Sequence, residues 1–257
     1  MQKSRFISLF FAFIIFISLI SCSSRNRKEY LSAEDSFRRA MEKYKKGKYL
    51  DASEAFTVIT LNFSGNAIVD SAQFYLGECN YRMKQYIVAA SEYERLINHY
   101  PYSGLVEKSK YQMGMCYFKL SPHYGLDQEY SQKCLDEFQE FTEYYPESTL
   151  IPEVLDKILE MRGKIAKKTY KSGELYYKMH DYKSANIYFD KVLESYYDTE
   201  YAPKALLKKM ESFLKMKQTE QAEMVFQRLK EKYPNSPAAK KADLLKHPVK
   251  RHVFLFW

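Results

Sequence analysis

Glycine and proline are scarce in this 257-residue sequence, which contains eight of each. A loop-rich all-β fold uses both residues heavily in its turns, so their scarcity disfavours that fold class. Hydrophobic residues make up 46% of the chain, an ordinary fraction for a protein with a packed core. The length allows one large domain or two small ones.

Sequence motifs of common enzymes and metal sites are also missing. The sequence shows no glycine-rich phosphate loop, no nucleophile elbow and no isolated pair of carboxylates. None of the five histidines is paired with another histidine or a cysteine at metal-ligand spacing within one helix. We therefore expect a protein that is not an enzyme, with no metal site and no cofactor other than a covalent lipid.

The apolar run near the start is too short for a permanent membrane span. Lys3 and Arg5 precede 15 uncharged residues from Phe6 to Ile20, whereas a spanning helix needs roughly 20. A basic start followed by an apolar segment of this length is typical of a signal peptide. We predict that residues 1–21 form a signal peptide that is removed.

A lipidation motif follows this segment. Leu19-Ile20-Ser21-Cys22 matches the bacterial lipobox, in which a cysteine receives diacylglycerol and then an N-acyl chain. Several acyl chains hold a protein firmly to a membrane, whereas one chain binds only marginally. We predict lipidation at Cys22, a flexible tether over 22–32 and, because Ser23 rather than Asp follows, sorting to the outer membrane. An ordinary signal peptide with an incidental cysteine is the alternative.

The formal net charge of +8 is compatible with nucleic-acid binding. A lipid anchor places the protein away from nucleic acid, however, so we expect no nucleic-acid partner. We expect the basic residues of the tether to interact with anionic lipid head groups instead.

A short Tyr-Pro phrase recurs at 99–103, 144–148 and 232–236. Before these phrases, and at two further places, a small residue precedes an aromatic residue by four positions. Residues with this spacing lie on one face of a helix. The five pairs are Ala52/Phe56, Ala89/Tyr93, Cys134/Phe138, Ala185/Phe189 and Ala222/Phe226.

A second helix precedes each of these, and Gly77, Gly114 and Gly173 in it mark a close helix crossing. Helix-turn-helix units of about 34 residues have the tetratricopeptide period, and stacked units bury a core that a single unit cannot. We predict an all-α tetratricopeptide solenoid of about five units. The repeat domain spans 33–240, with units near 33–66, 70–103, 107–148, 151–199 and 203–236.

Two insertions interrupt this period. Residues 121–130 lengthen the turn inside the third unit, and residues 150–165 lengthen the helix that opens the fourth. The serine after each Tyr-Pro phrase is expected to cap the next helix, most clearly Ser236. The tail 241–257 holds the only Trp and is either disordered or docked on a partner or on the last repeat.

The cysteines other than Cys22 occupy positions that favour small core side chains. Cys79 and Cys116 each follow a crossing glycine by two residues, and Cys134 replaces the alanine of the repeat. We expect three buried thiols, with a disulfide as the alternative.

The fifth, twelfth and thirteenth positions of each unit line the concave face of a tetratricopeptide array. Aromatic side chains beside a row of cations suit an extended peptide with aromatic residues and a free carboxylate. The alternative is that the repeat itself favours aromatic residues here. The predicted peptide groove consists of Phe37, Tyr44, Lys45, Phe74, Tyr81, Arg82, Tyr111, Phe118 and Lys119.

The lipobox, the five repeats and the two insertions together resemble the BamD family, outer-membrane lipoproteins of the β-barrel assembly machinery. The resemblance runs from Ala33 to Ser236 and is carried best by residues 126–148 and 176–206. It implies a lipid-anchored, periplasm-facing scaffold that helps to receive and insert outer-membrane proteins. Its partners would be the barrel-forming assembly subunit and unfolded outer-membrane proteins. The alternative is another lipidated tetratricopeptide adaptor, in cell-envelope or polysaccharide machinery.

Overall fold

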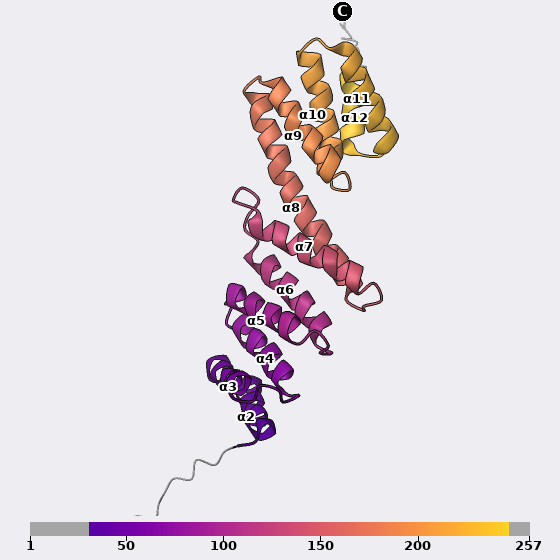
Figure 1. The fold of residues 1–257 in the computed structure, drawn as a ribbon. Helices are drawn as coiled ribbons and strands as arrows, with labels where there is room; N and C mark the ends of the chain where they lie inside the picture. The colour runs from indigo at the N-terminus through magenta and orange to yellow at the C-terminus, as the bar shows by residue number, and fades with distance from the viewer. Residues whose placement is uncertain (1–30, 247–257) are drawn as a thin grey trace, which may run out of the picture.

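The computed structural model describes residues 31–246, and every regular element in that range is an α-helix (Figure 1). The predicted signal peptide, Cys22 and residues 247–257 lie outside the described residues. The eleven described helices are α2 (Ala33–Lys45), α3 (Tyr49–Asn62), α4 (Val69–Arg82), α5 (Tyr86–His99), α6 (Val106–Leu120), α7 (Glu129–Tyr144), α8 (Ile151–Lys178), α9 (Tyr182–Ser195), α10 (Tyr201–Lys215), α11 (Thr219–Lys232) and α12 (Pro237–Lys246).

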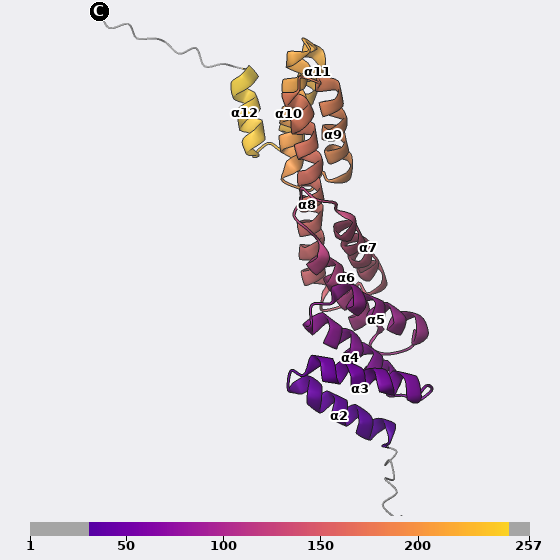
Figure 2. The ribbon, with the colours of Figure 1, turned by 90° about the vertical axis from the view of Figure 1, so that its left-hand side faces the viewer.

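The helices stack as consecutive pairs into an elongated solenoid, with α2 at one end and α12 at the other (Figures 1 and 2). The prediction of an all-α tetratricopeptide solenoid with five helix-turn-helix units is confirmed. The first helices of the units are α2, α4, α6, α8 and α10, and α12 follows the fifth unit. Residues 241–246, which were assigned to the tail from the sequence, continue helix α12.

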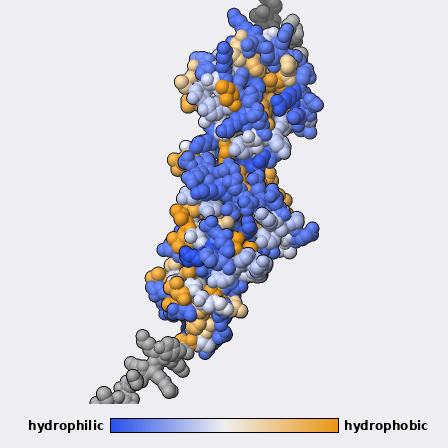
Figure 3. All heavy atoms as spheres, viewed as in Figure 1, coloured by the Kyte–Doolittle hydropathy of each residue, from blue (hydrophilic) through white to orange (hydrophobic). Residues whose placement is uncertain are grey.

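The core is a series of buried clusters along the stack, each shared by neighbouring units. Apolar residues on the surface form scattered patches among hydrophilic ones (Figure 3). All five pairs of a small and an aromatic residue, from Ala52/Phe56 to Ala222/Phe226, are buried and belong to these clusters.

The aromatic ring of each middle unit lies directly on a glycine of its first helix. A Cβ atom at Gly77 would lie 2.7 Å from Cε1 of Tyr93. The corresponding distance is 2.5 Å from Gly114 to Phe138 and 2.6 Å from Gly173 to Phe189. Ordinary side-chain contacts are longer, so any larger residue would push the two helices apart.

The Tyr-Pro phrases form the turns between units. The N–H of Tyr100 donates to the carbonyl of Leu96 and ends α5, and the N–H of Ser103 donates to the carbonyl of Tyr100. The turns at Tyr145 and Tyr233 repeat this pattern. The phrase therefore recurs because each unit needs the same chain reversal.

The serine cap predicted from the sequence holds for the last helix. The N–H of Ala239 donates to Oγ of Ser236 over 3.1 Å, so Ser236 caps α12. Ser103 and Ser148 differ, because α6 and α8 begin three residues after them. Their hydroxyls instead hold the turn to the preceding first helix, through 2.6 Å hydrogen bonds to Asp70 and Glu107 respectively.

Both predicted insertions lie where the spacing placed them. Residues 121–128 form a long turn between α6 and α7, and α8 has 28 residues. The cysteines also match expectation, since Cys79, Cys116 and Cys134 are free and buried. Burial raises the pKa of each thiol to about 12, which keeps it protonated and unreactive at neutral pH.

Glu137 on α7 is a carboxyl group in an unfavourable environment. Its Oε2 atom is buried, and no residue in the described part of the chain hydrogen-bonds to it. Burial, together with the charges of Glu140, Glu94 and Asp136, raises the pKa of Glu137 to about 7 against the opposing charge of Lys110. The folded protein therefore holds this proton more tightly than the unfolded chain does.

Gly114→Ala should destabilise the protein by about 1–3 kcal/mol, because the added methyl group overlaps the buried ring of Phe138. Urea or thermal unfolding measures this change. Gly163→Ala on α8 is the matched control, since nothing lies within 4 Å of its Cβ position. It should stabilise the protein by roughly 0.5–1 kcal/mol. Equal gains from both substitutions would show that the close crossing is absent in solution.

Glu137→Gln should stabilise the protein above pH 7, by on the order of 1–2 kcal/mol. Because the pKa is raised on folding, the stability that this group contributes is complete below about pH 4.5 and is lost as the pH rises through 7. The gain should therefore vanish near pH 5 in urea titrations. Glu143, an exposed residue in the last turn of the same helix, provides the control substitution Glu143→Gln. A gain that is the same at both pH values would rule out this origin.

Candidate functional site

The predicted peptide groove lies on the first helices of the first three units. Its three cations, Lys45, Arg82 and Lys119, are exposed at the ends of α2, α4 and α6. Its aromatic side chains are partly buried, except for Phe74. The partly buried ones are Phe37, Tyr44, Tyr81, Tyr111 and Phe118.

Phe74 does not belong to the groove surface. Only 1% of this residue is exposed. The ring of Tyr93 lies 5.7 Å from its ring, and the ammonium group of Lys108, from the next unit, lies 4.9 Å from its centre. The repeat position predicted the correct helix face, but side chains of α5 and α6 cover this ring.

Tyr75, which was not selected from the sequence, organises the aromatic residues of the first unit. Its ring centre lies 5.9 Å from that of Phe37, 5.3 Å from Tyr44 and 5.7 Å from Phe56. Such edge and stacked contacts stabilise the packing beyond area burial alone. Much of the predicted aromatic wall therefore joins the first unit to the second, and its rings are only partly exposed.

A buried carboxylate, Glu78 on α4, joins three units below the groove. It is 6% exposed. Its Oε1 accepts hydrogen bonds from the hydroxyl of Tyr93 over 2.7 Å and from Nε2 of Gln112 over 2.9 Å. Its Oε2 accepts a 3.3 Å hydrogen bond from the hydroxyl of Tyr44. These donors come from α5, α6 and α2, so the carboxylate is satisfied by hydrogen bonds rather than by a salt bridge.

Glu78 orients the polar groups that face solvent. Arg82 lies one helical turn further along α4 and is exposed. Its pKa is raised by a hydrogen bond to Tyr44 and by the charge of Glu78. Burial and the charge of Glu78 raise the pKa of Tyr44 to about 12, so its hydroxyl stays protonated. The guanidinium group is thereby held against the first unit while it remains accessible to an anion.

The third unit presents its aromatic residues differently. The ring of Tyr111 packs 6.1 Å from Phe138 and 6.2 Å from Phe141. Burial raises its pKa, with a further contribution from a hydrogen bond to Glu153. Phe118 lies under the ammonium group of Lys157, which is 4.4 Å from the ring centre. These contacts tie the third unit to α8, and only Lys119 of this group is exposed.

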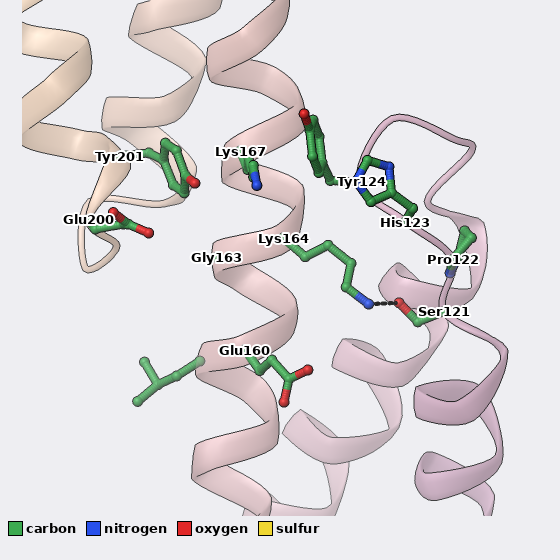
Figure 4. A pocket seen from close by; sticks show the side chains of 11 residues that line it. Ser121, Pro122, His123, Tyr124, Glu160, Gly163, Lys164, Lys167, Glu200 and Tyr201 are labelled. Carbon is green, nitrogen blue, oxygen red and sulfur yellow. Dashed lines mark hydrogen bonds between the residues drawn. The ribbon is translucent and has the colours of Figure 1, made fainter.

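An open cleft lies farther along the solenoid, between the long α6–α7 turn, the middle of α8 and the start of α10 (Figure 4). Its volume is about 500 Å³. The insertion that forms one wall was located from the sequence, but the cleft was not. It is lined by Ser121, Pro122, His123, Tyr124, Leu159, Glu160, Gly163, Lys164, Lys167, Glu200 and Tyr201.

Lysines of α8 hold the turn that forms this wall. Lys164 donates a 2.7 Å hydrogen bond to Oγ of Ser121, which Figure 4 shows across the cleft. Lys167 lies 4.1 Å from the ring centre of Tyr124, and Lys168 donates to the carbonyl of Leu126 over 2.8 Å. These contacts hold the turn against α8, and the lining of the cleft carries charges of both signs.

Within residues 31–246, no group of three or more His, Cys, Asp or Glu side chains is arranged to hold a metal ion. None of the helices in the same range is both long enough and apolar enough to cross a membrane.

Comparison with known proteins identifies the family. No curated protein matches the sequence significantly. The tetratricopeptide TPR2AB domain of yeast Sti1 covers 83% of this chain and 84% of its own, with 13% identity and a TM-score of 0.41. A thermophilic tetratricopeptide protein of Thermus thermophilus covers 82% and 96%, with 14% identity and a TM-score of 0.36. A family model described as outer membrane lipoprotein, YfiO, matches residues 30–227. Since this match covers most of the sequence, the chain belongs to the YfiO family of outer membrane lipoproteins.

Proposed function

We propose that this protein is a lipid-anchored scaffold of the machinery that assembles β-barrel proteins in the outer membrane. The observation that carries the proposal is the family match over residues 30–227, on a solenoid of five units. The lipobox at Cys22 and the resemblance to BamD support it. The anchor holds the solenoid on the periplasmic side, and no catalytic step is assigned to the protein.

The cleft beside α8 is the proposed docking surface for the barrel-forming subunit. The resemblance implies that the C-terminal units contact this partner, and the cleft lies where the third unit meets the fourth and fifth. Tyr124 and the exposed Leu159 supply contact area, while Lys164 and Glu160 supply charges of opposite sign. A fixed surface of this kind loses little conformational entropy when a folded domain binds.

The site around Arg82 is proposed to receive the end of an unfolded barrel protein. Such proteins commonly end in an aromatic residue with a free carboxylate. Arg82 offers the carboxylate an exposed guanidinium group that Tyr44 orients, while the hydroxyl proton of Tyr44 is itself donated to Glu78. Tyr81, whose ring packs 5.3 Å from that of Tyr86, and Lys45 would flank the peptide. Since Phe74 is buried, the peptide contacts the last turns of α2 and α4 rather than the middle of α4.

Cys22→Ala should abolish lipidation and release the protein from the outer membrane, because no acyl chain can be attached. Fractionation measures the association with the outer membrane. Copurification with a large outer-membrane barrel protein tests the proposed partner. The wild type should copurify with such a protein. A Cys22→Ala variant that is processed and fractionates like the wild type would contradict the anchor. A wild type that copurifies only with polysaccharide or other envelope machinery would favour the alternative adaptor function.

A peptide with an aromatic C-terminal residue and a free carboxylate should bind the protein, and its amidated form should bind more weakly. Arg82→Ala should raise the dissociation constant roughly tenfold, a loss of about 1.4 kcal/mol for an exposed ionic contact. Isothermal titration or fluorescence anisotropy measures both. Lys215→Ala is the matched control, because Lys215 is the exposed cation at the same position of the fifth unit. Equal affinity for both peptides, or equal losses in the two variants, would contradict the site.

A further inference from the structure

An apolar groove lies at the far end of the solenoid, on the last unit. Its walls are the end of α10, the start of α11 and the last turn of α12, and its volume is about 260 Å³. The apolar lining consists of Met210, Leu214, Ala222, Phe226 and Leu245. Pockets for small molecules are larger, roughly 300–1,000 Å³, so this groove suits one or two large side chains.

The groove results from the way α12 packs on the fifth unit (Figure 2). Ala238, Ala239 and Ala242 in the first turns of α12 are buried against α10 and α11. The last turn brings larger residues, and Leu244 and Leu245 are 61% and 44% exposed. Leu214, on the opposite wall, is 43% exposed. Leu214 and Leu245 therefore leave apolar surface exposed on opposite walls of one groove, and contiguous apolar surface is typical of interaction sites.

A segment of the same chain has the right composition and reach to cover it. Residues 253–257 read Val-Phe-Leu-Phe-Trp, five apolar residues in succession. Six residues, 247–252, separate this segment from the end of α12, and an extended chain of that length spans at most about 20 Å. Leu245 belongs to the groove itself, so the chain leaves α12 at the mouth of the groove.

We propose that residues 253–257 fold back into this groove and cap the solenoid, with an aromatic ring between Leu214 and Leu245. A tethered segment is present at an effective concentration near the millimolar range, which favours it over a second copy or a separate partner. Terminal repeats of a solenoid expose an apolar face that needs such a cap.

The single Trp of the chain, Trp257, reports directly on this proposal. In the full lipidated protein, purified in detergent, its fluorescence emission should be blue-shifted relative to the protein unfolded in urea. Acrylamide should also quench it less. Leu214→Asp should reverse both effects and leave the helical circular dichroism unchanged, because Leu214 is half exposed. Leu175→Asp on α8, also an exposed leucine, is the control that should leave the emission unchanged.

Three results would overturn the proposal. If the native wild type has the same emission and quenching as the unfolded protein, Trp257 is not buried. A blue shift that Leu214→Asp does not change would place the segment elsewhere, in the detergent micelle or in another part of the chain. A blue shift that disappears on dilution would mean that the segment enters a second copy rather than its own groove.

Discussion

The contact between a buried aromatic ring and a glycine on the facing helix sets the geometry of the middle units. At Gly77, Gly114 and Gly173 the ring lies closer to the backbone than any Cβ atom would permit. In these three units the first helix therefore crosses the second so closely that only glycine fits at the crossing. The buried clusters that neighbouring units share include these rings, so the stacking of the units rests on the same contacts.

The groove near the N-terminal end illustrates how a repeat fold builds a polar site on such a core. Glu78 is buried beside Gly77, and its oxygens accept hydrogen bonds from three helices of three successive units. Burying a carboxylate is unfavourable unless hydrogen bonds satisfy it, so this residue requires the three units to be correctly stacked. The same carboxylate orients Tyr44 and Arg82, which links the packing of the units to the proposed recognition of an anionic peptide end.

The repeat architecture could be predicted from the sequence because its signals are local. A small residue and an aromatic residue four positions apart, a glycine in the preceding helix and a Tyr-Pro turn each act within one unit. The site could be predicted only in part. Phe74 was assigned to the groove because its place in the repeat defines a helix face but not which side chains of α5 and α6 cover it. Glu78 was missed since its partners are 15 to 34 residues away and are brought together only by stacking.

The central proposal is that two separate regions of the solenoid serve different partners, an unfolded barrel protein near Arg82 and the barrel-forming subunit at the cleft beside α8. Site-specific photocrosslinking in living cells tests it most directly, with the photoreactive residue at exposed Lys45 or at Leu159 in the cleft. The account predicts adducts with newly made outer-membrane proteins from position 45 and one dominant adduct with a large barrel-forming subunit from position 159. The same adducts from both positions, or no outer-membrane protein from either, would contradict it.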